Sequence, residues 1–231
     1  MALPAAAAVI FDVDGTIVDT NDTHVEAWHG AFLALGYDLP KSRIIPHIGE
    51  GGDHLVPAVL GPAAERAHGD RLRSAPGSQF LATAARQHFR VFPGSADLLE
   101  ELRRRNVTTA LATSRQREHL SATLRSAGFD ASRLIDIVVT GSDANESKPA
   151  PDLIHAVLAR FETEPARCVM VGDTPCDGQA ASAADLPSVG LLCGGSPAEV
   201  LIRAGARAVR EHPADLLRQL DDTLGTALPV H

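Results

Sequence analysis

The 231-residue sequence has no apolar run near the ~20 residues that a membrane-spanning helix needs. Its apolar stretch 5–11 has no basic residue before it and leads directly into charged residues, so we do not expect a signal peptide. Cysteines are few and odd in number, and none has CxxC spacing. These absences favour a reduced, cytoplasmic protein with no membrane partner.

Positive charge is also scarce, because 21 Lys and Arg stand against 29 Asp and Glu for a formal net charge of −8. The only basic run, 103–105, falls at the end of an expected amphipathic helix, where a solvated face explains it. A general nucleic-acid binder would need a longer basic cluster, so we expect no nucleic-acid partner. Apolar residues are plentiful, at 45%, which suits one good core and a small second unit.

Short apolar runs rich in Val, Ile, Leu and Ala recur along most of the chain. They lack polar alternation, which is typical of parallel strands buried on both faces. Five are expected to be strands: 7–11, 108–112, 135–140, 168–171 and 188–193. Helical patterns separate most of them, with expected helices 96–105 behind a Ser95 cap, 152–161, one starting at Ser196-Pro197, and 214–224 behind Pro213. The alternation predicts an α/β fold with a Rossmann-like, doubly wound parallel sheet.

Residues 20–89 break this alternation and contain no convincing strand. We expect them to form a small α-helical domain inserted after the first strand, with residues 1–19 and 90–231 forming the core domain. The expected helices of the insert are one from an Asp22 cap to a stop at Gly36, then 55–60, 63–74 and 80–89.

Polar residues follow several predicted strands. The carboxyl ends of parallel strands meet at one edge of the sheet, where ligands bind. The polar segments are Asp12-Val13-Asp14-Gly15-Thr16, Thr113-Ser114-Arg115, Lys148 within 146–149, and Gly172-Asp173-Thr174 with Asp177. Four carboxylates, two hydroxyls and a lysine are therefore expected together.

Four carboxylates in one place repel one another unless a cation neutralises them. Mg²⁺ takes oxygen ligands and shares its coordination shell with phosphate, and the absence of paired His or Cys residues argues against zinc. Lys148, with Arg115, would add positive charge for an anionic substrate. A carboxylate nucleophile can form an aspartyl phosphate, and the hydroxyls of Thr113 and Ser114 could hold the phosphoryl oxygens.

In this order the segments resemble the four motifs of the haloacid dehalogenase-like hydrolases. The resemblance covers nearly the whole chain, and the insert resembles the small cap domain of that family. It implies a Mg²⁺-dependent phosphatase of the phosphoglycolate phosphatase or β-phosphoglucomutase-like kind, acting on a small phosphorylated metabolite. Neither the individual substrate nor the choice between monomer and homodimer follows from the sequence.

The resemblance implies that Asp12 attacks phosphorus, that Asp14 is the general acid–base, and that Lys148 neutralises charge. The implied Mg²⁺ ligands are Asp12, Asp14 through its carbonyl group, Asp173 and, in the inner or outer shell, Asp177. Asp177 could equally be only a helix cap.

The resemblance is less specific about which residues contact the substrate. Thr113 and Ser114 would bind the phosphoryl group, but either could simply cap the next helix. Arg115 could be a solvated arginine, and Gly15 permits close backbone approach. His24 matches a position that faces substrate in related sugar-phosphate mutases, or it is a plain polar helix residue.

The stretch "IGEGGDHLVP", residues 48–57, carries three glycines within four positions. It is either a helix–helix loop or a flexible loop that leans into the active site and selects the leaving group. Glu50, Asp53 and His54 could then face the substrate. Asp19, where the chain leaves the core, is assigned to the hinge of the cap.

Three other functions compete with phosphatase activity. A phosphosugar mutase fits residues 20–28, but the glycine-rich loop replaces the expected arginine-serine loop. A 2-haloacid dehalogenase usually lacks an aspartate at the position of Asp14. A catalytically silent binding protein on this fold has little support, since no required residue is missing.

Overall fold

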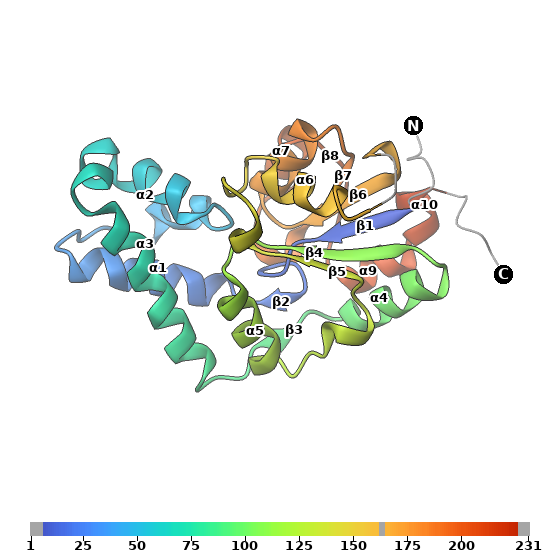
Figure 1. Ribbon diagram of the computed structural model, residues 1–231, viewed down its shortest axis with the longest axis horizontal. Coiled ribbons are helices and arrows are strands. Elements are labelled where there is room, and N and C mark those ends of the chain that lie inside the picture. The colour runs from blue at the N-terminus through green and yellow to red at the C-terminus, as the bar shows by residue number, and fades with distance from the viewer. Residues whose placement is uncertain (1–6, 162–164, 226–231) are drawn as a thin grey trace.

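The computed structural model describes residues 7–161 and 165–225. Its central sheet has the strand order β5-β4-β1-β6-β7-β8, and all neighbouring pairs are parallel (Figure 1). The strands are β1 (Ala8–Phe11), β4 (Thr108–Ala112), β5 (Ile137–Val139), β6 (Cys168–Gly172), β7 (Ser188–Leu191) and β8 (Ala206–Arg210). The predicted doubly wound α/β core is confirmed.

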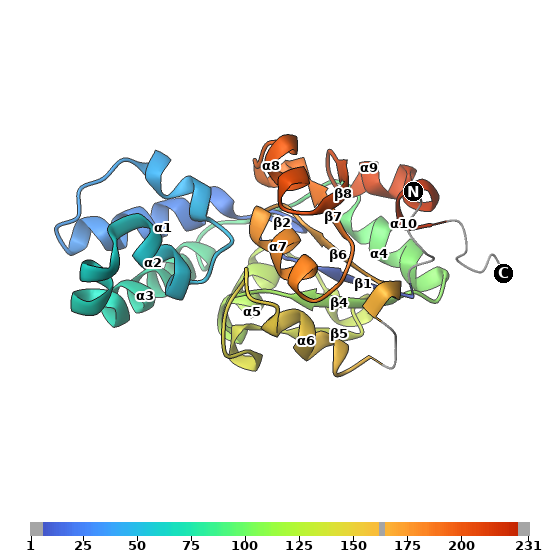
Figure 2. The same cartoon turned by 90° about the horizontal axis from the view of Figure 1, so that it is seen from above.

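Helices cover both faces of this sheet (Figures 1 and 2). They are α4 (Ser95–Arg104), α5 (Arg117–Ser126), α6 (Asp152–Leu158), α7 (Pro175–Ala183), α8 (Ala198–Arg203), α9 (Pro213–Arg218) and α10 (Leu220–Leu224). Alternate residues of β1 enter different apolar layers: Val9 and Phe11 pack with α4 and α9, whereas Ala8 and Ile10 pack with α6 and α7. This explains why the strand is apolar at every position.

Three further helices, α1 (Asn21–Ala34), α2 (Gly52–Leu60) and α3 (Pro62–Ala84), lie to one side of the sheet (Figures 1 and 2). They share an apolar cluster of their own, which contains the buried Trp28. A short antiparallel ribbon of β2 (Val18–Asp19) and β3 (Arg90–Val91) lies where the chain leaves and re-enters the sheet layer. In the described ranges, no helix is both long enough and apolar enough to cross a membrane.

The helix α3 corrects the expectation of separate helices over 63–74 and 80–89. It continues through Pro76 and ends at Ala84. Leu72, Pro76 and Phe80 are spaced four residues apart and are all buried, so tertiary packing of one face outweighs the local cost of proline.

Several predicted helix starts are also shifted. Gly94 adopts a left-handed φ of 79° before α4, and the hydroxyl of Ser95 donates to the carbonyl of Phe92 (2.9 Å) instead of capping the helix. Thr20, rather than Asp22, precedes α1, and Pro197, rather than Ser196, precedes α8. Gly36 follows the end of α1 with a φ of 83°, which confirms its role as a stop.

The predicted helix 214–224 is interrupted at Gln219, whose backbone leaves the helical region and divides the segment into α9 and α10. The strands β2, β3 and β8 were not predicted. β2 and β3 have two residues each, too few to show a period. β8 is an edge strand of sequence ARAVR, and its arginines break the apolar pattern used to find buried strands.

Candidate active site

Polar residues meet at the carboxyl ends of three adjacent strands because β1 lies between β4 and β6. Asp12 follows β1, Thr113 follows β4 and Asp173 follows β6. Backbone hydrogen bonds extend the ladder to the first two of them, with Asp12 N donating to the Val171 carbonyl group (2.9 Å) and Thr113 N donating to that of Val139 (3.2 Å). The fold therefore places these side chains at one edge, as parallel topology requires.

Lys148 comes from the loop after β5 and is 1% exposed. Its Nζ donates to Asp12 Oδ1 at 2.5 Å and to Asp177 Oδ1 at 2.8 Å. Burial would lower the pKa of Lys148, but the two carboxylates raise it above its ordinary value. The lysine is thus a buried, permanently charged ammonium group that bridges two motifs.

Asp177 has two contacts that use different oxygens. Its Oδ2 accepts from Thr174 N (3.1 Å) and Thr174 Oγ1 (2.7 Å) in a capping box at the start of α7. Its Oδ1 faces Lys148. Asp177 therefore caps α7 with one oxygen while its other oxygen faces Lys148, so the cap role does not remove it from the carboxylate cluster.

Asp12, Asp173 and Asp177 each offer one oxygen within 4.8 Å of the others, and all three are buried. Burial and Asp177 raise the pKa of Asp173 to about 7, and burial with the neighbouring carboxylates raises that of Asp12 against the effect of Lys148. A single lysine does not neutralise three carboxylates. The set offers oxygen ligands only and holds more negative charge than Lys148 offsets, so it fits a hard divalent cation such as Mg²⁺.

Space around Asp173 is kept free by glycines. A Cβ on Gly15 would lie 2.2 Å from Asp173 Oδ2, and one on Gly194 would lie closer still to the same oxygen. Gly15 also has a φ of 83°, which lets the chain turn after Asp14. These glycines explain how the loops after β1 and β7 approach the carboxylate cluster so closely.

Asp14 has different surroundings from Asp12, although one residue separates them. Its Oδ1 accepts from Thr20 Oγ1 (2.6 Å) and lies 3.2 Å from His24 Nε2, while Arg115 Nε lies 4.0 Å from its Oδ2. Burial alone would raise the pKa of Asp14, but these neighbours hold it well below its ordinary value. The side chain of Asp14 lies outside the three-carboxylate cluster, which leaves only its carbonyl group for the predicted metal contact.

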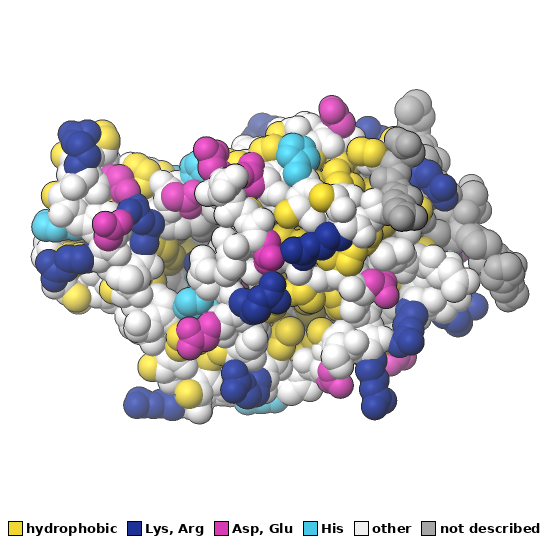
Figure 3. All heavy atoms as spheres, in the orientation of Figure 1, with side chains coloured by type: hydrophobic (Ala, Val, Ile, Leu, Met, Phe, Trp, Pro, Cys, Tyr) yellow, Lys and Arg dark blue, Asp and Glu magenta, His cyan; other side chains and the backbone are white. Residues whose placement is uncertain are grey.

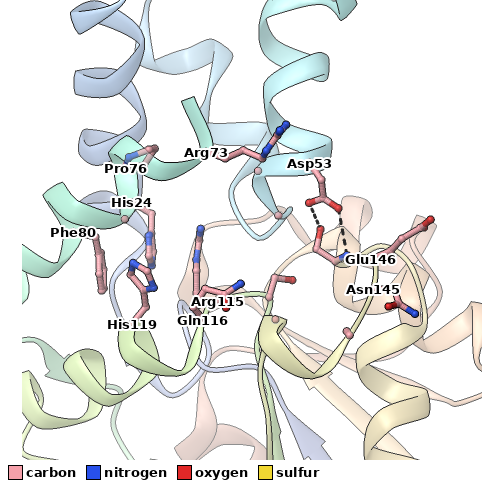
Figure 4. Close-up of a pocket in the computed structure, with 17 residues that line it drawn as sticks. His24, Asp53, Arg73, Pro76, Phe80, Arg115, Gln116, His119, Asn145 and Glu146 are labelled. Atoms are coloured by element: carbon pink, nitrogen blue, oxygen red, sulfur yellow. Dashed lines mark hydrogen bonds between the residues drawn. The ribbon is translucent and has the colours of Figure 1, made fainter. Parts of the chain in front are cut away.

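A pocket of about 310 Å³ opens beside Asp14, between the helical insert and the sheet layer (Figure 4). Ser114 and Arg115 line both this pocket and a smaller space in front of Asp12 and Asp14. Figure 4 shows Arg115 directed towards the insert. His24 reaches the pocket from α1, so the structure brings it and the motif residues to one place.

Several residues that line this pocket were not predicted from the sequence: Arg73, Phe80, Gln116, His119 and Asn145. His119 lies in the first turn of α5, and nothing in the local sequence distinguished it from the other histidines of the chain. Arg73 and Phe80 could not be placed, because α3 was predicted in two pieces.

The glycine-rich stretch lies against the sheet layer. A Cβ on Gly49 would be 2.6 Å from Thr174 Cγ2, and Asp53 Oδ1 accepts from Ser147 Oγ at 2.5 Å. Of the three residues that could face substrate, Asp53 lines the pocket, whereas Glu50 contacts His47 at 3.0 Å and His54 does not line it.

Two other residues near the site have simple surroundings. Asp19 pairs with Arg90 (2.6 Å) across the β2–β3 ribbon. Cys176 is buried, and burial raises the pKa of its thiol to about 12, which suits a small apolar filler. On the face in Figure 3, the dark-blue Lys and Arg side chains are scattered rather than gathered in one patch.

The chain is similar to known proteins in sequence and in fold. A family model described as haloacid dehalogenase-like hydrolase matches residues 9–191. A phosphoglycolate phosphatase of Salmonella typhi is 30% identical over 237 residues, covering 92% of this chain and 91% of the relative. A hydrolase from Pseudomonas syringae is 31% identical with a TM-score of 0.85, over 93% of this chain and 97% of that one. The CbbY protein of Rhodobacter sphaeroides, solved with phosphate, is 26% identical with a TM-score of 0.71, over 91% and 96% of the two chains.

Proposed function

The chain belongs to the haloacid dehalogenase-like hydrolases and is a hydrolase of the phosphatase kind; we propose that it hydrolyses a small phosphate monoester with Mg²⁺ through an aspartyl phosphate on Asp12. One observation carries this proposal. Asp12 lies among carboxylates and Lys148, whereas Asp14 lies among Thr20, His24 and Arg115. Two carboxylates with different surroundings are what a nucleophile and a separate acid–base need.

In the first step, a carboxylate oxygen of Asp12 attacks phosphorus, and the bond from phosphorus to the ester oxygen breaks. Thr113 and Ser114 hold the phosphoryl oxygens with Lys148, which also orients Asp12. The ester oxygen leaves with a proton from Asp14. An arriving phosphate dianion raises the pKa of Asp14 and lets it carry that proton.

In the second step, a water molecule gives its proton to Asp14 and attacks phosphorus, which releases phosphate and restores Asp12. The low pKa of Asp14 suits this step, because the ionised form is the base. Asp12, Asp173, the carbonyl group of Asp14 and, directly or through water, Asp177 would hold Mg²⁺. When bound, Mg²⁺ supplies positive charge that offsets the negative charge of the phosphoryl group.

We also propose that residues 20–89 act as a cap on a core of residues 1–19 and 90–231, with the Asp19–Arg90 ribbon as its hinge. Contacts of Gly49 with Thr174 and of Asp53 with Ser147 support closure over the site. Closure would exclude bulk water during transfer and opening would release product. Small esters, not phosphoproteins, should then be the substrates.

The relatives support this choice over the competing functions. The name of one is phosphoglycolate phosphatase, and another was solved with phosphate. Both point to a small phosphorylated metabolite as the substrate.

The test measures phosphate release from p-nitrophenyl phosphate and a panel of small phosphate esters, with Mg²⁺ and with EDTA. We expect Mg²⁺-dependent release that Asp12→Asn abolishes. Isomerisation of a hexose 1-phosphate without release of phosphate would favour the mutase. Chloride release from a 2-chloroacid without Mg²⁺ would favour the dehalogenase. No turnover of any ester would overturn the proposal.

A further inference from the structure

Asn21, the first residue of α1, joins the helical insert to the carboxylate cluster. Its Nδ2 donates to Asp173 Oδ2 (2.9 Å) and to the carbonyl group of Gly194 (2.9 Å). The two acceptors lie on different loops, one after β6 and one after β7. One side-chain amide of the insert therefore holds both a carboxylate of the cluster and a neighbouring loop of the sheet layer.

These hydrogen bonds also fix which way the amide of Asn21 faces. A carboxylate and a carbonyl group accept hydrogen bonds, so both must face the NH₂ side of the amide. Its Oδ1 is then a buried acceptor that has no hydrogen-bond partner among the described residues. Asn21 also lines the small space in front of Asp12 and Asp14, which has a volume of about 10 Å³. This is about the room that one water molecule needs, so the unused acceptor suits a small donor at this point.

Each oxygen of Asp173 accepts a hydrogen bond from a side-chain donor. Thr16 Oγ1 donates to Oδ1 (2.7 Å), and Asn21 Nδ2 donates to Oδ2. Thr16 belongs to the loop after β1, whereas Asn21 belongs to the insert. The two donors hold the carboxylate in one orientation beside Asp12 and Asp177, so its orientation depends in part on where the insert lies.

The start of α1 is hydrogen-bonded to two acidic segments of the site. Thr20, the residue before Asn21, donates to Asp14 Oδ1 (2.6 Å), and Asn21 donates to Asp173. Gly15 leaves the room that the amide occupies, since a Cβ there would lie 2.4 Å from Asn21 Nδ2. The insert cannot move away at this point without breaking these hydrogen bonds.

From these contacts we propose that Asn21 is a positioning residue that couples the insert to the metal site, so that Mg²⁺ binding and the docking of α1 stabilise each other. The proposal rests on the proposed function, since it takes the carboxylate cluster as a Mg²⁺ site. It assigns a role to a residue that lies outside the four motif segments. The position of the insert would then depend on whether the ion is bound.

Coupling of this kind is reciprocal. If the docked α1 strengthens Mg²⁺ binding by some factor, then bound Mg²⁺ must stabilise the docked α1 by the same factor. Loss of a hydrogen-bond partner of a metal ligand typically weakens metal binding about 10- to 100-fold. We therefore expect a factor of about ten from Asn21, both in the affinity for Mg²⁺ and in the local opening of α1.

Calorimetry with MgCl₂ measures the affinity. Asn21→Ala should raise the Kd for Mg²⁺ about tenfold, and Asn21→Ser, which keeps one shorter donor, should raise it less. Thr16→Val is the matched comparison, because it removes the other side-chain donor to Asp173 and should also raise Kd. Asp22→Asn, at the exposed next residue of α1, should leave Kd unchanged.

Hydrogen exchange, followed by mass spectrometry, measures the coupling. In the wild type, saturating Mg²⁺ should slow exchange of the α1 amides from His24 onward about tenfold relative to those of α4. In Asn21→Ala, with Mg²⁺ again saturating, this effect should disappear, whereas in Thr16→Val it should remain. Both variants bind Mg²⁺ more weakly, so the difference between them separates coupling from a general weakening of the metal site.

A wild-type Kd for Mg²⁺ in Asn21→Ala would overturn the inference, and so would slowing of α1 exchange by Mg²⁺ that survives in this variant. Neither measurement uses turnover, so the expected results support the inference even if no ester is hydrolysed. If Asn21→Ala hydrolyses an ester with the Mg²⁺ dependence of the wild type, the inference fails while the proposed function stands.

Discussion

Ser147 donates a 2.5 Å hydrogen bond to Asp53 and joins the helical insert to the loop that carries Lys148. The contact is exposed, so it adds little to the stability of the fold. The contact matters instead for its position, because Lys148, the next residue after Ser147, bridges Asp12 and Asp177. The contact therefore links closure of the proposed cap to the site itself.

Ser147→Ala and Asp53→Asn should each raise KM about 2- to 10-fold for a small ester, the effect of one exposed hydrogen bond, with Tm unchanged. The double variant should be no worse than either single one, since both remove the same contact. Asp38→Asn, at an exposed aspartate of the insert, serves as the control. Additive effects of the two substitutions would show that the contact does not act during turnover.

Asp12→Asn should lower kcat by at least about a thousandfold while the fold survives. The amide cannot attack phosphorus, but it removes one negative charge from three crowded carboxylates and leaves Lys148 paired with Asp177. Without Mg²⁺, the Tm of the variant should equal or exceed that of the wild type. Steady-state kinetics and thermal unfolding measure the two effects. Retained turnover would contradict the role of Asp12 as nucleophile.

The sequence was most informative where chemistry and burial act on the same residues. The apolar runs before Asp12, Thr113 and Asp173 predicted three strands, and parallel topology then required their polar ends to meet. The edge strand Ala206–Arg210 was not predicted, because it pairs on one side only and carries arginines. The continuity of the long helix through Pro76 was not predicted either. It depends on tertiary packing of Leu72 and Phe80, which no local sequence pattern shows.

The motif residues were predicted from the strand ends in the same way, but most of the other residues that line the pocket were not. Lys148 could be placed by motif order alone, whereas Arg73 and His119 reach the pocket from α3 and α5. Which residues face a cavity between the helical insert and the sheet layer depends on how these two parts pack against each other. That information lies in contacts such as Asp53 with Ser147, for which the sequence offered only candidates.

Metal and pH should affect stability together. Burial and Asp177 raise the pKa of Asp173 to about 7, above its ordinary value of 3.8. Between these values the folded state holds a proton that the unfolded chain has lost, so this group makes the metal-free protein less stable as pH rises through that window. Mg²⁺ binds the ionised form, so its stabilising effect should grow over the same range.

Thermal unfolding in Mg²⁺ and in EDTA, at about pH 5.5 and about pH 7.5, measures this effect. The gain in Tm from Mg²⁺ should be at least about 2 °C larger at the higher pH. NaCl at the same ionic strength controls for screening, and Asp173→Asn should remove most of the gain. A Mg²⁺ effect that is independent of pH, or that persists in the variant, would place the cation elsewhere.

Gly49→Ala and Gly36→Ala separate backbone strain from contact with the site. Both glycines have positive φ, 101° and 83°, so alanine should lower the free energy of unfolding by about 1–2 kcal/mol in each. A Cβ on Gly36 meets nothing within 4 Å, but one on Gly49 would lie 2.6 Å from Thr174 Cγ2 and push the glycine-rich stretch away from the sheet layer.

Only Gly49→Ala should therefore lower kcat/KM, about tenfold, since an incompletely closed cap admits water and misplaces the ester. Urea unfolding and steady-state kinetics on the two variants provide the comparison, and equal kcat/KM values would show that closure against Thr174 does not limit the reaction.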